Sequence, residues 1–117
     1  MSGDAAGDGD GRVYRTVTAS ARVTEGRITV CRVGVRPVAL TRLRGRVIAF
    51  RNLCPHAGSP LSGGTLARDA ITCPRHGWRF ELSTGACRDQ PLYSLTFFDA
   101  FERDGQVHVE DPGDPTD

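Results

Sequence analysis

Two short segments rich in proline and glycine each carry one cysteine and one histidine, and no other feature constrains the fold as strongly. RNLCPHAGSPL (51–61) contains Cys-x-His, and ITCPRHGWRFELSTG (71–85) contains Cys-x-x-His. The four residues are Cys54, His56, Cys73 and His76. Thiolates and neutral imidazoles are ligands for transition metals, and sixteen residues separate the two pairs. We therefore expect a fold that brings two loops together at one metal centre.

The ligand types favour a redox centre of iron and sulfide. Thiolates are soft, negatively charged donors that hold ferric iron and tolerate bridging sulfide. Neutral imidazoles remove charge from the iron that they bind and so raise its affinity for an electron. Pro55 and Pro74 stiffen the two loops, and Gly58 and Gly77 allow backbone amides to turn toward the sulfurs. The backbone is thus expected to shape the site.

The rest of the chain predicts an all-β fold. Short runs rich in β-branched residues recur between glycines, which is typical of strands joined by tight connections. The expected strands are 13–18, 27–35, 37–43, 47–51, 70–73, 78–82, 95–102 and 106–110. Glycine is placed for a tight turn in Arg44-Gly45, Thr84-Gly85 and Asp104-Gly105. No helix longer than one or two turns is expected.

These motifs also carry a family resemblance. CPHAGSPLSGG followed by CPRHGWRFELSTG resembles the two cluster-binding loops of the Rieske family, especially of its bacterial ferredoxins, and the likeness spans roughly residues 13–109. The resemblance implies a Rieske-type antiparallel β-sandwich or barrel with a cluster-binding subdomain built from two hairpin loops. It also implies one Rieske-type 2Fe-2S cluster. Cys54 and Cys73 would bind its inner iron, and His56 and His76 its outer iron through Nδ1.

A zinc ion is the alternative occupant, because two cysteines and two histidines also suit tetrahedral Zn²⁺. The spacing argues against zinc. Zinc fingers pair cysteine with cysteine and histidine with histidine, whereas each loop here contains one of each. A colourless protein with one zinc per chain would contradict the iron cluster, and a red-brown protein would support it.

The sequence departs from the high-potential members of the family, which carry an extra cysteine in each loop. Ser59 and Arg75 stand at those positions, so no disulfide can join the loops. Trp78 and Phe80 stand where those members have hydroxyl groups near the sulfurs. Because a hydrogen bond to a charged acceptor contributes about 1.5 to 3 kcal/mol, its loss lowers the affinity for an electron. We expect a reduction potential toward the low end, roughly −150 mV.

The two ends of the chain differ from its body. Residues 1–11 are rich in glycine, alanine and aspartate, and residues 111–117 contain two prolines and no apolar side chain. We expect flexible acidic tails at 1–11 and 111–117 around one Rieske domain at 12–110. No run approaches the ~20 apolar residues of a membrane span, and no signal peptide is recognisable. A cytoplasmic protein is therefore expected, with no membrane partner.

No set of nucleophile, base and orienting acid is recognisable, which favours an electron carrier over an enzyme. The resemblance implies a ferredoxin that carries electrons from a flavin-containing ferredoxin reductase to a Rieske non-haem iron oxygenase. The alternative is a small subunit fixed in a larger oxidoreductase, such as an assimilatory nitrite reductase. We expect these protein partners, no nucleic acid, and a monomer when the chain is free.

Other residues with chemical potential have structural interpretations. Cys31 is expected in a strand as a small buried residue, and Cys87 has no second ligand near it in the sequence. His108 alternates with two valines and is expected to point outward from a sheet. Trp78 and Phe80 are expected to pack the core or shield the cluster.

Charge and apolar surface near the loops predict how partners bind. All 15 arginines lie between positions 12 and 109, which hold seven acidic residues. Those in or between the ligand loops are Arg51, Arg68, Arg75 and Arg79. They predict a basic docking face, with arginines solvated on strand faces as the alternative. Apolar loop residues would form a docking patch or merely cover the cluster: Ala57, Pro60, Leu61, Pro74 and Trp78.

Overall fold

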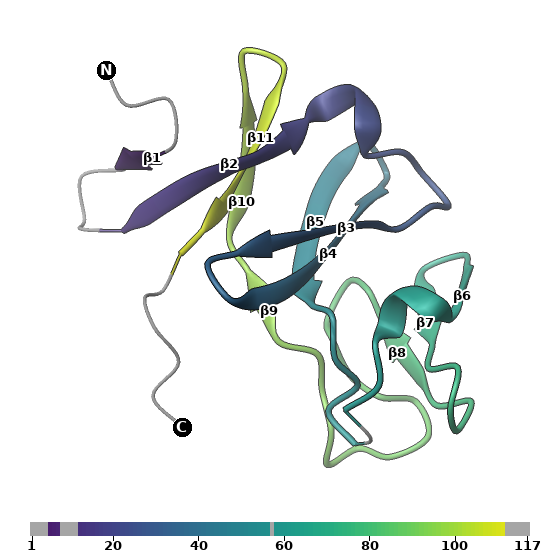
Figure 1. Ribbon diagram of the computed structural model, residues 1–117. Helices are drawn as coiled ribbons and strands as arrows, with labels where there is room; N and C mark the ends of the chain where they lie inside the picture. Colours follow the sequence, from purple (N-terminus) through teal and green to yellow (C-terminus); the bar gives the residue numbers. More distant parts are fainter. Residues whose placement is uncertain (1–4, 8–11, 57, 112–117) are drawn as a thin grey trace.

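Short strands in three antiparallel sheets make up about half of the part of the chain that the structure describes, residues 5–7, 12–56 and 58–111 of a computed structural model (Figure 1). The strands are β1 (Ala5–Gly7), β2 (Val13–Ala19), β3 (Thr29–Val33), β4 (Arg36–Leu43), β5 (Arg46–Arg51), β6 (Thr65–Ala67), β7 (Ala70–Thr72), β8 (Arg79–Glu81), β9 (Phe97–Phe98), β10 (Ala100–Arg103) and β11 (Gln106–Glu110). Two 3₁₀ turns, η1 (Ser20–Arg22) and η2 (Leu61–Gly63), complete the elements. The all-β prediction is confirmed. Among the described residues, no helix is long and apolar enough to cross a membrane.

Two four-stranded sheets form the larger region, which we call the base. Their strand orders are β1-β2-β11-β10 and β3-β4-β5-β9. The side chains buried between them are small and aliphatic: Val23, Val33, Val38, Leu40, Ala49, Val107 and Val109. In β11 the buried valines alternate with His108, as the period of a strand requires. The half-buried His108 ring lies against Phe101 and hydrogen-bonds to Thr16 Oγ1 at 2.9 Å, in keeping with its structural interpretation.

Glycine turns set the register of the base. Leu43 pairs with Arg46, so Arg44 and Gly45 alone connect β4 to β5, with φ of 51° and 82°. Asp104 and Gly105 connect β10 to β11 in the same way, with φ of 54° and 75°. Positive φ at both central residues matches the right-handed twist of the flanking strands. The sequence prediction of these two hairpins is confirmed.

Three details differ from the sequence prediction. The single strand expected at 95–102 is two strands, since Phe97–Phe98 pairs with β5 in one sheet and Ala100–Arg103 pairs with β11 in the other. Strand β6 was not expected, because its turn to β7 is Arg68-Asp69 and contains no glycine. Within the expected N-terminal tail, Ala5–Gly7 pairs with β2. Residues 1–4, 8–11 and 112–117 of the expected tails lie outside the described residues.

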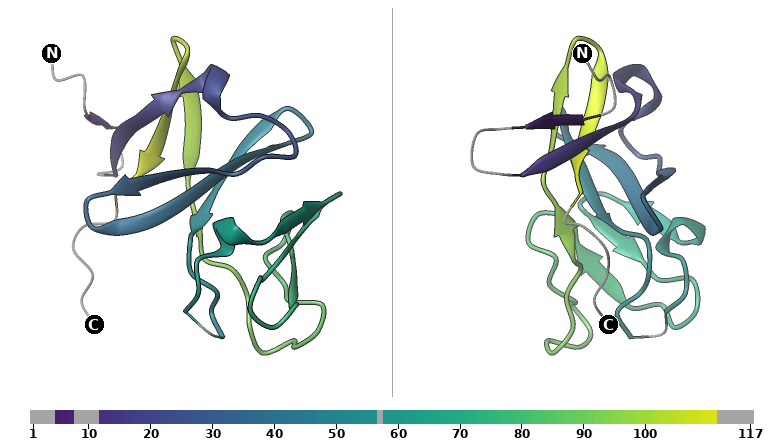
Figure 2. Two further views of the ribbon diagram at one scale, coloured as in Figure 1. Left: turned by 45° about the vertical axis from the view of Figure 1, so that its right-hand side comes forward. Right: turned by 60° about the vertical axis from the view of Figure 1, so that its left-hand side comes forward.

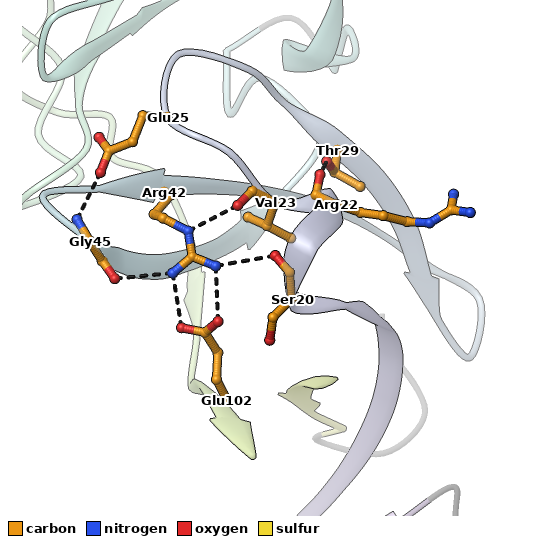
Figure 3. Close-up of polar contacts among 8 residues, drawn as sticks. All are labelled: Ser20, Arg22, Val23, Glu25, Thr29, Arg42, Gly45 and Glu102. Carbon is orange, nitrogen blue, oxygen red and sulfur yellow. Dashed lines mark hydrogen bonds and ion pairs between the residues drawn. The ribbon is translucent and has the colours of Figure 1, made fainter. Parts of the chain in front are cut away.

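Arg42 joins the parts of the base (Figure 3). Its guanidinium donates to the backbone carbonyls of Val23 at 2.9 Å, Gly45 at 3.0 Å and Ser20 at 3.3 Å. It also forms a bidentate pair with Glu102 on β10, at 2.9 and 3.0 Å. The hydrogen bonds with Glu102 are the main cause that raises the pKa of Arg42 and lowers the pKa of Glu102. The side chain of Arg42 thus connects its own sheet to η1, to the β4–β5 turn and to β10 of the other sheet.

The smaller region, which we call the ligand-loop end, consists of the sheet β6-β7-β8 and the loops around it. Figures 1 and 2 show this region at the lower end of the molecule, whereas the tip of the β10–β11 hairpin stays at the upper end in every view. Its strands have only three residues each. A second set of buried residues lies beneath it: Ala39, Phe50, Cys54, Leu61, Ile71, Cys73, Phe80, Leu82, Cys87 and Leu95.

Candidate functional site

The two predicted ligand loops have the same backbone hydrogen bonds. In the first, the amide of Cys54 donates to the carbonyl of Ser59 at 2.7 Å, and the amide of Gly58 donates back to the carbonyl of Cys54 at 2.8 Å. In the second, Cys73 donates to Trp78 at 2.8 Å, and Gly77 donates to Cys73 at 3.0 Å. Each cysteine is therefore held at the start of a closed loop of six residues.

Glycine is required at the closing position of each loop. Gly58 and Gly77 have φ of 71° and 75°, a left-handed conformation that other L-residues adopt only with strain. Proline follows each cysteine and fixes φ at the first corner of the loop. The expectation that proline and glycine shape the loops through the backbone agrees with this geometry.

The two thiols and the two imidazoles lie at different depths. Cys54 and Cys73 are 2% and 1% exposed and belong to the same buried cluster. His56 and His76 are exposed at the loop tips, with ring centroids 4.7 Å apart. Within the described ranges, no three His, Cys, Asp or Glu side chains lie close enough together to hold a single metal ion. The structure instead places a pair of thiols inside and a pair of imidazoles outside.

Aromatic rings hold His56. The indole of Trp78 stacks on its imidazole at 4.0 Å between centroids with an interplanar angle of 26°. The ring of Tyr93 approaches edge-on at 5.7 Å and also contacts Trp78 at 5.3 Å. Trp78 thus covers the His56 ring and packs against the core, and Phe80 is fully buried in that core, so the predicted packing role is seen for both residues. The contact of Tyr93 was missed, because nothing in the sequence spacing links position 93 to position 56.

The first ligand loop is anchored to the η2 turn by a buried amide. Asn52 is 4% exposed; its Nδ2 donates to Ser62 Oγ at 3.0 Å, and its Oδ1 accepts from the Ser62 amide at 2.8 Å. After η2 the chain passes so close to β7 that a Cβ on Gly64 would lie 1.8 Å from the carbonyl oxygen of Thr72. Glycine at position 64 is therefore needed for this close approach, whereas its φ of −88° is one that any residue can adopt.

The apolar loop residues are divided between core and surface. Leu61 is fully buried and Trp78 half-buried, whereas Pro60 and Pro74 are exposed; Ala57 lies outside the described residues. Leu92, which was not expected, is 89% exposed in the turn that precedes Tyr93. The two exposed prolines could contact a partner, whereas the buried Leu61 belongs to the core beneath the loops.

The other two cysteines lie outside the two ligand loops, although Cys87 belongs to the same buried cluster as Cys54 and Cys73. Cys31 lies half-buried in β3, and burial raises the pKa of its thiol to about 11, so it stays protonated near neutral pH. Cys87 is 5% exposed among the core residues and pairs by a backbone bridge with Phe80. Both agree with a structural role, although Cys31 is less buried than expected.

The comparisons with known proteins agree with one another. Residues 14–98 match the family described as the Rieske [2Fe-2S] domain. The chain is 34% identical over 100 residues to ferredoxin CarAc of Metapseudomonas resinovorans, covering 84% of this chain and 94% of that protein.

Two solved structures have a closely similar fold. One is a ferredoxin in complex with the oxygenase of carbazole 1,9a-dioxygenase (TM-score 0.74, 33% identity, 83% of this chain and 92% of that chain). The other is a putative NADH-dependent nitrite reductase small subunit from Mycobacterium tuberculosis (TM-score 0.77, 27% identity, 89% of this chain and 99% of that chain).

Proposed function

The chain belongs to the Rieske [2Fe-2S] domain family, and from this we propose that it is a ferredoxin that carries single electrons to a Rieske non-haem iron oxygenase. It is an electron-transfer protein and not itself a catalytic enzyme. The observation that carries the proposal is the likeness to CarAc and to the carbazole dioxygenase ferredoxin, over almost the full length of both. A flavin-containing reductase would supply the electron.

We propose one 2Fe-2S cluster of the Rieske type, bound by Cys54, His56, Cys73 and His76. The donor set suits this group, because two buried thiols form a soft, anionic side and two exposed imidazoles form a neutral side. Matching backbone hydrogen bonds close both loops, the two cysteines belong to one buried cluster, and the two imidazole rings lie 4.7 Å apart. Bound there, such a cluster takes up and releases one electron.

The protein contributes shielding and access. Buried side chains beneath the loops, among them Phe80 and Leu61, exclude water from the thiol side. The exposed imidazole edges leave a short path to a partner, so the histidine side is the proposed route for the electron. Trp78 and Tyr93 fix the plane of His56, which limits the rearrangement that accompanies electron transfer.

The purified protein tests the cluster directly. We expect a red-brown protein with two iron atoms and two sulfide ions per chain, and an electron paramagnetic resonance signal of the Rieske type after reduction. We expect a reduction potential of roughly −150 mV, because neither Trp78 nor Phe80 offers a hydroxyl to the cluster. A colourless protein with one zinc per chain would refute the cluster, and a potential above about +100 mV would refute the argument from missing donors.

The function is tested by reconstitution with a reductase and an oxygenase encoded near the gene. Substrate oxidation by the oxygenase should depend on this protein, and single-turnover mixing should show its cluster oxidised as the oxygenase is reduced. An oxygenase that turns over equally fast without it would refute the proposed role.

A small subunit of a larger reductase is the second candidate, because the putative nitrite reductase small subunit from M. tuberculosis is covered over 99% of its length. Permanent co-purification with a large catalytic subunit would favour it over a free carrier.

For a free carrier we propose a monomer in the cytoplasm, with one folded domain at 12–110. Asp111, placed in the expected tail, is tied to this domain through its amide and the Val13 carbonyl at 2.7 Å.

A further inference from the structure

The ligand-loop end has more arginine than its ion pairs neutralise. Residues 51–95 contain five arginines and three acidic residues. All three carboxylates are engaged, in the pairs Arg44–Asp69 at 2.6 Å, Arg79–Asp89 at 2.9 Å and Arg88–Glu81. Within residues 51–95, the exposed arginines that form no ion pair with any residue the structure describes are Arg51, Arg68 and Arg75.

Two of these arginines flank the proposed cluster site. Arg75 lies inside the second ligand loop, between Pro74 and His76. Arg51 ends β5, and with Pro55 and Gly58 of the first loop it lines a hollow of about 220 Å³ beside Cys54. Arg68 lies in the β6–β7 turn, at the end of β7 away from Cys73, so it is not part of this pair. We call Arg51 and Arg75 the loop arginines.

The charge of the loop arginines persists in both redox states. A 2Fe-2S core of charge +2 bound by two thiolates is formally neutral, and reduction adds one negative charge. That single charge does not cancel two cations. Arg79, which the sequence placed in the same basic group, is held by Asp89 through its guanidinium and its backbone amide. Of the four arginines that the sequence suggests for a basic docking face, Arg51 and Arg75 therefore remain as the exposed ones beside the proposed ligands that form no ion pair within the described residues.

We propose that the loop arginines form a basic docking face for an acidic surface on the oxygenase that takes the electron. The inference rests on the proposed function and deepens it, because it states the chemistry of the partner's surface. Complementary charge mainly raises the rate of encounter, and salt weakens it over a Debye length of ~8 to 10 Å. The reaction should therefore depend on ionic strength with a definite sign.

Small charged redox complexes can test the sign of the charge on this face without the natural partner. The reduced holoprotein is mixed in a stopped-flow instrument with anionic ferricyanide or with cationic tris(phenanthroline)cobalt(III). We expect the ferricyanide rate to fall about three- to tenfold from low salt to about 0.5 M salt, and the cobalt rate to rise. Arg75→Glu and Arg51→Glu should each slow ferricyanide at low salt while leaving the visible spectrum unchanged.

Arg22→Glu is the matched control. Arg22 is an exposed arginine of the η1 turn, its side chain points away from the Arg42 contacts in Figure 3, and η1 lies at the end of the molecule opposite the ligand loops. It should change the ferricyanide rate by less than about twofold. A poly-glutamate peptide serves as an acidic probe: it should slow ferricyanide oxidation of the parent and of Arg22→Glu, but not of Arg75→Glu.

The outcomes separate this inference from the proposed function. A Rieske spectrum with a ferricyanide rate that rises with salt, or with equal effects of Arg75→Glu and Arg22→Glu, overturns the basic docking face alone. A protein with no two-iron spectrum overturns the proposed function and this inference with it. The expected salt dependence, lost in Arg75→Glu and kept in Arg22→Glu, supports both.

Discussion

The base and the ligand-loop end are stabilised in contrasting ways. The base has strands of up to eight residues, a core of small aliphatic side chains, and Arg42 as a charged joint between its sheets. The ligand-loop end has strands of three residues, and three of its buried side chains are cysteines. A sheet of such short strands has few backbone hydrogen bonds of its own. The base should therefore fold without a bound group, whereas the ligand-loop end should depend on one.

Removing a proposed ligand gives the largest expected effect. His76→Ala or Cys73→Ser should abolish the Rieske spectrum, because each leaves three donors for a group that needs four. The far-ultraviolet circular dichroism of the base should persist. Cys31→Ser and Cys87→Ser should keep the spectrum, because neither side chain lies in a ligand loop.

Two results would break this part of the comparison. Loss of the cluster in Cys31→Ser or Cys87→Ser would show that a ligand is misassigned. Complete unfolding of the base in His76→Ala would show that the two regions form one cooperative unit.

Gly64→Ala should damage the ligand-loop end while sparing the base. The added Cβ would lie 1.8 Å from the Thr72 carbonyl oxygen, and neither backbone can yield without moving a ligand loop. We expect destabilisation by about 3 kcal/mol and a lower iron content per chain. Gly63→Ala is the control, since its Cβ would meet only Pro74 Cγ at 3.7 Å, an ordinary contact. Equal iron content in the two variants would contradict the role of this close approach.

Arg42→Met should destabilise the base while sparing the ligand-loop end. It removes the charged hydrogen bonds to Glu102 and leaves the Val23 and Ser20 carbonyls without that donor. We expect a loss of about 2 kcal/mol in urea unfolding of the base, with the cluster spectrum unchanged. Arg46→Met, at an exposed arginine of the same hairpin, should cost less than about 0.5 kcal/mol. A lost spectrum with intact base stability would reverse the assignment of Arg42 to the base.

The smallest expected effect is the loss of stability of the base at acidic pH. The hydrogen bond from Arg42 lowers the pKa of Glu102, so this pair stabilises the fold above the usual glutamate pKa. The contribution is lost as pH falls through the lowered value, and for a partly exposed pair it amounts to at most about 1 kcal/mol. Urea unfolding at pH 6 and pH 3.5 measures it. Glu102→Gln should lose less stability between these pH values than the parent, and an equal loss would contradict the linkage.

The sequence predicted the local features of both regions better than their long-range contacts. Two hairpins of the base follow from Arg44-Gly45 and Asp104-Gly105, because the turn conformation depends on the residues themselves. The division of 95–102 between two sheets does not, since alternation cannot show where a strand changes partners. Strand β6 was missed for a related reason: it is short, and its turn adopts a positive φ at Arg68, a residue type that gives no turn signal.

The sequence alone could point to the residues of the candidate site, whereas the side chains that surround them in the fold could not be predicted. Cysteine, histidine, proline and glycine at fixed spacings indicate ligands and loop shape, because the chemistry constrains each position. The stacking of Trp78 on His56 and the approach of Tyr93 depend on chain segments that meet only in the folded protein. The same holds for the pairing of Arg79 with Asp89, which removes one arginine from the predicted basic group.

The matching loops also separate the shape of the backbone from the position of the histidine that it carries. Both close six residues with the same two hydrogen bonds, yet the histidine is the second residue after cysteine in one and the third in the other. The same closed backbone thus accommodates a histidine at either of two positions. The position of the histidine in such a loop can therefore differ by one residue while the two hydrogen bonds that close the loop stay the same.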